Sequence, residues 1–242
     1  MQQFDEEDHI EDYPVLLFLT REGYFKKITP QSWRMSQDHK LKEGDEVFWT
    51  AEATNKNEII FFTNMQQAYK AHLYDFEDSK ASVLGDYLAS KLEMDEAKRR
   101  FMPSCRVTTR AVWSLCSKRQ GSPVSMESFE TKTNRRRLTG AYSDKAPAVA
   151  FFHPIEEESE VTMFSTANRA LTFRASMLDV KASRSTQGVQ TMVLRGKHTI
   201  TRACRTEDAA LSDNARYRCR SIPSIGALLT DEDLPDKQLK LL

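Results

Sequence analysis

Apolar residues along this chain gather in short runs that are separated by polar or charged segments. The runs have the length of strands and their β-branched and aromatic content, and few windows show the spacing of an amphipathic helix. The best helix candidate, Ala81–Lys98, is interrupted by Gly85. The pattern predicts an all-β domain built of hairpins. Its candidate strands are VLLFLT (15–20), EVFWTAEA (46–53), EIIFFT (58–63), AVAFF (148–152), EVTMFS (160–165), ALTFRA (170–175), VQTMVL (189–194) and HTITRA (198–203).

Three segments share one plan and indicate an internal repeat. In each, an apolar strand ends in Thr or Ser, a polar turn follows, and a second strand returns with basic residues. Gly23 and Asn168 stand at the turns of the first and third copies, and both residue types tolerate the positive φ of a tight hairpin. Gln66, at the turn of the second copy, fits less well. The copies are LFLTREGYFKKI (17–28), IFFTNMQQAYKA (60–71) and MFSTANRALTFR (163–174).

The spacing of the copies predicts a fourth one. The first two start 43 residues apart and the next gap is 103 residues, which leaves room for one further hairpin near residues 110–125. A period of about 40–50 residues with several strands per unit is the signature of a propeller-like array.

Composition limits the partners of such an array. With 35 basic and 35 acidic residues the net charge is zero, so nucleic acid or a membrane would have to be met by a local patch. No apolar run approaches the roughly 20 residues of a membrane helix, and the acidic N-terminus does not resemble a signal peptide, so a cytoplasmic location is the default expectation. Four scattered cysteines do not make a disulfide framework.

Motifs for independent catalysis or metal binding are not found in the sequence. The five histidines (His9, His39, His72, His153 and His198) form no metal-binding set, and neither a phosphate-binding loop nor a nucleophile elbow is present. The acidic run HPIEEESE (153–160) is more simply a solvated turn than an acid/base pair. We therefore expect no catalytic residue, no metal and no cofactor in this chain.

Four phrases of the sequence resemble a known family. In this order and spacing they look like the C-terminal domain of type IIA DNA topoisomerases, the family of the A subunit of DNA gyrase and its topoisomerase IV counterpart. The resemblance covers roughly residues 13–230 and is strongest at the loop Arg184–Val189. The phrases are VLLFLTREGYFKKITPQS, IIFFTNMQQAYKAHLYDF, TKTNRRRLTGAYSDK and EVTMFSTANRALTFRASMLDVKASRSTQGVQTMVL.

The resemblance implies a β-pinwheel, a propeller-like disc of four-stranded blades whose basic outer rim binds and bends duplex DNA. We expect about four blades or an incomplete disc over residues 13–229, between an acidic tail at 1–12 and a C-terminal tail at 230–242. Residues 221–229 are either a last strand or a linker. The implied role is that of a DNA-binding accessory domain without catalysis, in the bacterial cytoplasm and on the chromosome.

The resemblance also separates this chain from the catalytic parts of the family. Few residues precede the first strand, so we expect a fragment or stand-alone copy without the breakage–reunion domain, which in the parent enzyme is a partner together with the ATPase subunit. Both ATP and magnesium belong to those other parts. Arg216-Tyr217 superficially matches the catalytic Arg-Tyr pair of the family, but its setting favours an ordinary loop tyrosine.

The candidate DNA-binding residues lie on the basic loops and return strands. The densest cluster is KTNRRR (132–137), whose basic side chains could neutralise phosphates. The alternative for this cluster, and for each basic residue taken singly, is a solvated surface charge without a binding role. The family's glycine-rich basic box is reduced at 32–45 to basic residues and Gly44, so tight chiral wrapping of DNA is not expected, and a topoisomerase IV-like or divergent gyrase-like role fits better. Gly140 and Gly188 are predicted to permit tight loops. The candidates are Lys26, Lys27, Arg34, Lys40, Lys42, Lys70, Lys132, Arg135, Arg136, Arg137, Lys181 and Arg184.

A rival interpretation is a propeller-like scaffold for protein interactions with no role on DNA. The neutral net charge is its best support, although both acidic tails contribute to that neutrality.

The segment 101–123 breaks the pattern at the place where the fourth hairpin is expected. Cys105 and Cys116 are spaced too far apart, with no nearby histidine, for a convincing metal site. The basic residues there are consistent with a DNA-contacting insertion.

A third explanation is a shifted reading frame. When residues 112–117 are translated back into codons and the codons are read two bases later, they can encode an apolar strand. The codons of residues 119–123, read one base later, can encode a return strand that begins with Gly-Lys. About three single-base deletions would account for this, and the written segment would then be disordered or misfolded.

Overall fold

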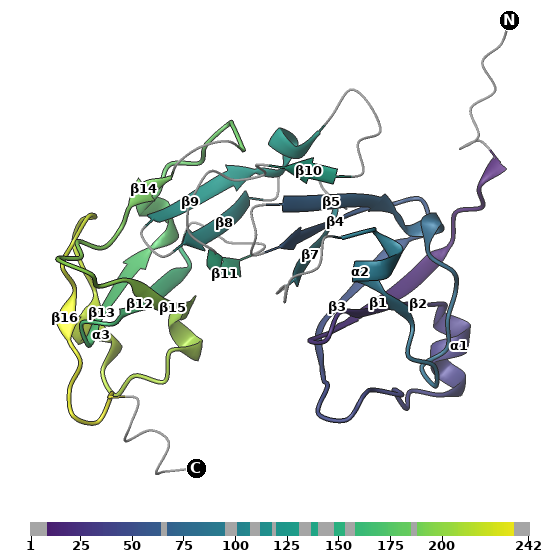
Figure 1. Cartoon of the computed structure of the whole chain (residues 1–242), viewed down its shortest axis with the longest axis horizontal. Helices are drawn as coiled ribbons and strands as arrows, with labels where there is room; N and C mark the ends of the chain where they lie inside the picture. The colour runs from purple at the N-terminus through teal and green to yellow at the C-terminus, as the bar shows by residue number, and fades with distance from the viewer. Residues whose placement is uncertain are drawn as a thin grey trace, which may run out of the picture. The chain divides into compact units, whose positions relative to one another are not determined.

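The chain forms two compact units, residues 1–108 with 133–139 and residues 109–132 with 140–242. In the computed structural model the described residues are 9–63, 67–94, 101–106, 112–117, 120–130, 137–139, 148–152, 158–184 and 188–234. Within these residues each unit contains two four-stranded antiparallel sheets, and no helix exceeds six residues. Figure 1 shows the strands of each sheet. The all-β class predicted from the sequence is confirmed.

The first unit holds the first and second sheets. The first sheet has the order β3-β1-β2-β6 and consists of β1 (Pro14–Thr20), β2 (Tyr24–Ile28), β3 (Val47–Thr54) and β6 (Asp86–Tyr87). The second sheet has the order β10-β5-β4-β7 and consists of β4 (Glu58–Thr63), β5 (Gln67–His72), β7 (Phe101–Arg106) and β10 (Arg137–Thr139).

The second unit holds the third and fourth sheets. The third sheet has the order β11-β8-β9-β14 and consists of β8 (Val112–Ser117), β9 (Gln120–Ser125), β11 (Ala148–Phe152) and β14 (Val189–Gln190). The fourth sheet has the order β15-β12-β13-β16 and consists of β12 (Glu160–Ser165), β13 (Arg169–Arg174), β15 (Ile200–Arg205) and β16 (Ala227–Leu228).

All four sheets follow the same plan. A hairpin forms the centre, a third strand pairs with the first strand of the hairpin, and a short fourth strand pairs with the second. In the first three sheets the fourth strand comes from chain that follows the hairpin of the next sheet: β6 follows β4 and β5, β10 follows β8 and β9, and β14 follows β12 and β13. Consecutive sheets are therefore interlocked through the chain, and the fourth sheet instead takes β16 from the chain after its own third strand.

The hairpin turns explain the sequence repeat. Gly23 and Asn168 have φ of 89° and 53°, the left-handed region that the repeat predicted for them. Their backbone N–H groups donate to the carbonyls of Thr20 and Ser165 at 3.0 and 3.1 Å, respectively. In both hairpins the pairing register between the first strand and the third strand of the sheet shifts by one residue at this Thr or Ser. The turn of the second copy, which includes Gln66, lies outside the described residues.

The core of the first unit uses both faces of its central strands. Leu17 and Leu19 pack with Phe61 and Phe76 on one face, and Phe18 packs with Ile28 and the indole of Trp33 on the other. A strand covered on both faces needs an unbroken apolar run rather than alternation, which accounts for VLLFLT and EIIFFT. Among the described residues of the second unit, a core cluster forms around Val161, Met163, Leu171, Phe173 and Met192.

Helical turns follow the second strand of each hairpin. They are α1 (Pro30–Met35), η2 (Leu73–Asp75), η3 (Met126–Phe129) and η4 (Ala175–Met177); the other short helices are α2 (Leu88–Lys91), η5 (Thr206–Asp208) and α3 (Asn214–Tyr217). Thr29 caps α1 through a hydrogen bond from the N–H of Ser32. The predicted helix over 81–98 is reduced to α2 in the described part, because Gly85 adopts a φ of 86° and β6 intervenes. No helix among the described residues is long and apolar enough to cross a membrane.

The segment 101–125 occupies the place that the spacing predicted. Strands β8 and β9 form the hairpin of the third sheet, with Trp113 opposite Val124, and β7 pairs with β4. The remaining residues of 101–123, and the side chains of the whole segment, lie outside the description. Residues 227–228 resolve the alternative left open for 221–229, since they form the strand β16.

Candidate nucleic-acid interface

Three of the candidate lysines are buried and paired, which corrects their predicted place on an exposed rim. Lys26 is 1% exposed, Lys27 3% and Lys70 7%. Lys70 forms an ion pair with Glu58 at 2.7 Å across the hairpin of the second sheet. The aliphatic stems of these lysines pack against apolar surface on the return strands, which buries the amines. A buried amine is costly without a partner, so each one is paired.

Lys27 has both a neutral and a charged partner. Its Nζ donates to Oδ1 of Asn55 at 2.7 Å and lies 3.1 Å from Oδ1 of Asp78, with the ring of Tyr13 at 5.8 Å. Asn55 also donates from Nδ2 to the carbonyl of Glu11 at 2.9 Å. Lys27 therefore fastens the start of the domain and cannot serve as a free phosphate contact.

The exposed candidates of the first unit cluster around the segment between β2 and β3. Arg34 lies in the last turn of α1, and Lys40 and Lys42 lie on the loop 36–46; all three are exposed. The Nζ of Lys42 lies 5.0 Å from the centre of the Tyr24 ring, and a hydrogen bond to Tyr24 raises the pKa of Lys42. These three side chains are accessible to a ligand.

In the second unit, Lys181 and Arg184 join two segments that are far apart in sequence. Lys181 forms an isolated parallel bridge with Val124, and its carbonyl accepts from the N–H of Ser125 at 3.2 Å. Arg184 donates from Nη1 to the carbonyl of Ser128 at 3.1 Å. Both side chains are half-buried, so they combine a structural contact with partial exposure. Gly188 has a φ of 77°, as a tight loop requires.

The densest predicted cluster lies largely outside the described residues, which exclude Lys132, Arg135, Arg136 and Gly140. Arg137 begins β10, is exposed, and places its guanidinium 6.0 Å from the centre of the Tyr69 ring. DNA binding by this cluster stays a prediction.

The structure reveals one basic loop that the sequence interpretation missed. Residues 195–199, RGKHT, precede β15, and Arg195, Lys197 and His198 are all exposed. Gly196, between the two cations, has a φ of 64° with open space around it. The signal that would have found this loop is a glycine flanked by basic residues directly before a strand.

The missed loop is the counterpart of the loop 36–46. In the first sheet Thr20 pairs with Val47 across the ladder shift, and in the fourth sheet Ser165 pairs with Ile200 across the same shift. The residue after each hydroxyl, Arg21 or Thr166, donates its N–H at 3.0 Å to the residue that ends the loop. The same structural position thus carries an exposed loop with two cationic side chains in both units, although the loop 36–46 also carries four carboxylates.

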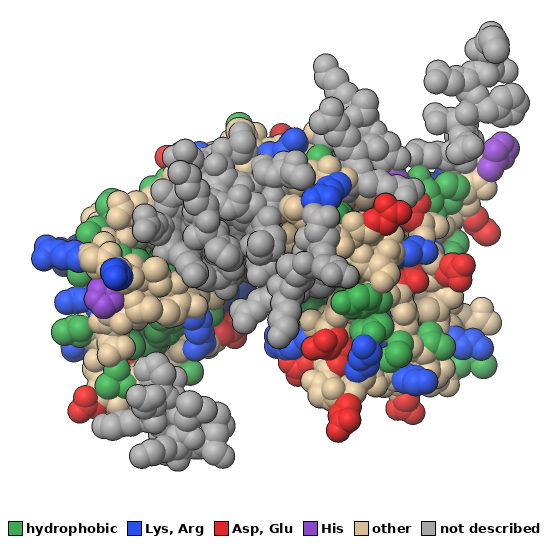
Figure 2. Space-filling model, in the orientation of Figure 1, with side chains coloured by type: hydrophobic (Ala, Val, Ile, Leu, Met, Phe, Trp, Pro, Cys, Tyr) green, Lys and Arg blue, Asp and Glu red, His purple; other side chains and the backbone are tan. Residues whose placement is uncertain are grey.

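Charge is unequally divided between the two units. The first unit has 17 basic and 20 acidic residues, and the second has 18 basic and 15 acidic residues. Figure 2 shows basic side chains gathered on the visible face of the second unit, while both signs alternate on the first. The neutral chain therefore contains a unit with a positive excess.

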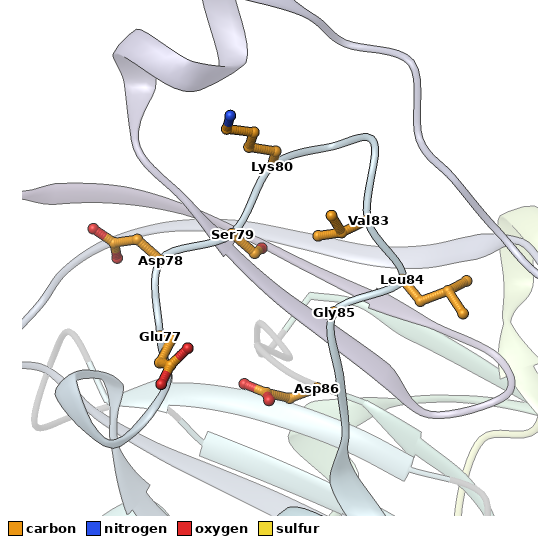
Figure 3. Close-up of a pocket in the computed structure, with 8 residues that line it drawn as sticks. All are labelled: Glu77, Asp78, Ser79, Lys80, Val83, Leu84, Gly85 and Asp86. Atoms are coloured by element: carbon orange, nitrogen blue, oxygen red, sulfur yellow. The ribbon is translucent and has the colours of Figure 1, made fainter.

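One pocket among the described residues of the first unit does not suit phosphate. It is a hollow of about 560 Å³ lined by residues 77–80 and 83–86. The carboxylates of Glu77, Asp78 and Asp86 project from this one loop, with Lys80 at its far side (Figure 3). Even with Asp78 paired to Lys27, the lining carries more carboxylates than amines and disfavours an anion, so we place no ligand there.

Among the described residues no group of three His, Cys, Asp or Glu side chains is arranged to hold a metal ion. Tyr217 ends α3, is 1% exposed, and donates to Asp233, whereas Arg216 is exposed. The tyrosine that superficially matches the family's catalytic pair is a buried structural residue of a helix rather than of a loop.

The fold has close counterparts among solved structures. The chain aligns with the C-terminal domain of a DNA topoisomerase IV with a TM-score of 0.71 and 18% identity, over 81% of this chain and 62% of that one. It aligns with the C-terminal domain of E. coli ParC with a TM-score of 0.64 and 12% identity, over 90% and 94% of the two chains. The chain has the fold of a type IIA topoisomerase C-terminal domain.

Distant sequence similarity agrees with this topoisomerase C-terminal-domain fold. The A subunit of DNA gyrase from Kosmotoga olearia is 23% identical over 212 residues, which is 83% of this chain and 26% of the relative. The same protein of Thermotoga maritima is 26% identical over 104 residues, 40% of this chain and 13% of the relative. The chain thus spans about a quarter or less of these relatives, and no family model matches it. The resemblance read from the sequence is confirmed in fold and in distant similarity.

Proposed function

We propose that this domain binds and bends duplex DNA as a non-catalytic accessory part of a type IIA topoisomerase. The observation that carries the proposal is the exposed basic loop 195–199 of the fourth sheet. Its counterpart in the first sheet, the loop 36–46, presents Lys40 and Lys42, together with four carboxylates. The two solved domains that share the fold belong to topoisomerases, which supports the same role.

The chemistry is that of phosphate contact without base reading. Lys and Arg side chains that meet phosphates release condensed counterions, and this release favours binding at low salt. Contacts of this kind position a duplex and select deformable sequence rather than a base code. The exposed candidates are Arg34, Lys40, Lys42, Arg137, Lys181, Arg184, Arg195 and Lys197.

Other components complete the proposed enzyme. The breakage–reunion domain would supply DNA cleavage, and the ATPase subunit would supply ATP and magnesium chemistry. Loop 36–46 contains a single glycine, Gly44, so we propose bending rather than tight chiral wrapping. The site of action would be the bacterial cytoplasm, on the chromosome.

A salt titration tests the proposal with matched variants. The slope of log affinity against log salt falls by about 0.9 for each phosphate that is no longer neutralised, so R195A/K197A should reduce it by about 2. R216A/R220A removes the same charge from exposed positions of the same unit and should change the slope much less. If both double variants behave alike, the loop 195–199 has no specific role.

Two further measurements test the remaining parts of the proposal. Replacing Arg135, Arg136 and Arg137 together by Ala should lower both affinity and slope; unchanged values would remove that cluster from the interface. Bending should speed the ligase-catalysed closure into a circle of a duplex near its persistence length of about 150 base pairs.

The acidic excess of the first unit favours one alternative, a scaffold for protein interaction. The two functions differ in their behaviour toward a long duplex. Retarded migration of such a duplex at low salt supports DNA binding, and its absence together with an unperturbed fold supports the scaffold.

A further inference from the structure

The loop 36–46 is fastened to the first sheet by one buried amine. The Nζ of Lys26, on β2, donates to the carbonyls of Ala81 and Lys40 at 2.9 and 3.0 Å and contacts Nδ1 of His39 at 3.2 Å. An ammonium group has three N–H donors and no acceptor, so three acceptors match it completely. Two of the three belong to the loop.

This contact fixes the protonation state of His39. Because the Lys26 ammonium only donates, Nδ1 of His39 must accept, which requires a neutral ring with its proton on Nε2. An imidazolium has no free electron pair on Nδ1. Protonation would therefore replace a hydrogen bond by two cations 3.2 Å apart.

The surroundings offer little compensation for a second positive charge. The His39 ring lies against Phe18 of β1 and Trp33 of α1, with ring centres 4.6 and 5.2 Å away. The segment 77–86 contributes the Ala81 carbonyl and Gly85, where a Cβ would lie 2.7 Å from the Lys26 side chain. Asp45, on the loop itself, is the carboxylate that interacts with Lys26.

The geometry points to Lys26 and His39 as positioning residues for the loop 36–46, with protonation of His39 as the event that releases it. This inference rests on the proposed function where it concerns DNA, because the loop carries Lys40 and Lys42. Release of the loop itself does not depend on that function.

The direction of the pH effect follows from the environment. Burial lowers the pKa of His39 and the Lys26 cation lowers it further, so the ring stays neutral at pH 7 and takes up a proton below its ordinary value of about 6.5. Burial also lowers the pKa of Lys26, which Asp45 opposes. Acid ordinarily strengthens DNA binding because carboxylates and histidines gain protons, whereas release of the loop weakens it.

Hydrogen exchange tests the release without DNA. His39→Gln keeps a side-chain acceptor for Lys26 but does not titrate, and His9→Gln makes the same substitution at an exposed, distant histidine. At pH 7.5 all three proteins should exchange peptides of 36–46 at equal rates. At about pH 5, wild type and His9→Gln should exchange this loop at least about threefold faster than His39→Gln, because a hydrogen bond to a charged group is lost. Equal rates at the lower pH would overturn the inference.

Two companion measurements separate the possible failures. Lys26→Met keeps the buried stem and removes the donors, so it should expose the loop to exchange at both pH values while the peptides of β1 and β4 stay protected. DNA affinity at constant salt should fall at least about threefold in wild type relative to His39→Gln between pH 7.5 and 5. Faster exchange without this loss of affinity would refute the DNA role of the loop and leave its release standing.

Discussion

The phenol of Tyr217 donates a 2.5 Å hydrogen bond to Oδ2 of Asp233, and both side chains are buried. The same carboxylate accepts from the hydroxyl of Thr230 at 2.7 Å and from the N–H of Ser212 at 2.7 Å. Thr230 and Asp233 fall in the segment 230–242 that the sequence assigned to a loose tail. The packed structure therefore continues beyond residue 229, and Asp233 ties it to α3.

We expect Tyr217→Phe to destabilise the second unit. It removes one donor from a buried carboxylate, and hydrogen bonds to charged groups contribute about 1.5–3 kcal/mol. Denaturant unfolding should show this loss in the free energy of unfolding. Arg216→Ala, at the exposed neighbour, should change stability by less than about 0.5 kcal/mol, and an equal effect of both variants would contradict the assigned roles.

The carboxylate of Asp233 should also give the domain an acid-sensitive component of stability. Burial by itself raises the pKa of Asp233, but the hydrogen bonds from Tyr217, Ser212 and Thr230 outweigh it and lower the pKa. A lowered pKa means that the contribution is present above the ordinary value of about 3.9 and is lost as the pH falls below it. Asp233→Asn should flatten the stability profile between pH 5 and 3; an unchanged profile would show that other groups cause it.

Tyr13 should ionise at a higher pH than an ordinary tyrosine, whose pKa is about 10. Burial, followed by its 2.8 Å hydrogen bond to Asp78, raises its pKa to about 12. The neutral phenol therefore contributes fully to the free energy of unfolding below pH 10, and this contribution is lost as the pH rises toward 12. A difference absorbance titration between wild type and Tyr13→Phe should place the missing transition near pH 12, and Asp78→Asn should move it back toward 10.

Two glycines allow the cost of a left-handed backbone to be separated from the cost of a steric clash at Cβ. Gly85 and Gly44 have φ of 86° and 77°, but a Cβ at Gly85 would lie 2.4 Å from the carbonyl oxygen of Phe25, and one at Gly44 meets nothing within 4 Å. Gly44→Ala should cost about 1–2 kcal/mol for the left-handed backbone alone. Gly85→Ala should cost clearly more, because the backbone of β2 must also move. Equal losses in thermal unfolding would argue against the tight approach of 77–86 to β2.

The reading frame of 101–123 can be settled from nucleotides. If the deletions that we infer are present, codons 112–117 will encode an apolar strand when read two bases later, and codons 119–123 a Gly-Lys return strand when read one base later. A chain with the restored frame should unfold at higher temperature, because an apolar strand replaces Ser, Thr and Arg. Codons that give no strand in either shifted frame would reject the hypothesis.

The sequence by itself determined the central hairpins of this protein. Unbroken apolar runs such as EIIFFT became strands buried on both faces, and the hydroxyl-to-turn spacing placed Gly23 and Asn168 at left-handed positions. Those signals are local, since turn chemistry and strand burial depend on residues a few positions apart. The spacing of the copies also located the hairpin of β8 and β9.

Tertiary structure decided which charges face water. Lys26, Lys27 and Lys70 look like surface lysines in the sequence, yet Ala81, Asp78 and Glu58 receive their amines in the interior. Those partners lie 12 to 55 positions away along the chain, so no local pattern announces them. The equivalence of the loops 36–46 and 195–199 likewise depends on pairing between distant strands. Periodicity specifies a strand, whereas the exposure of a long flexible side chain is set by the partners that the completed fold brings to its end.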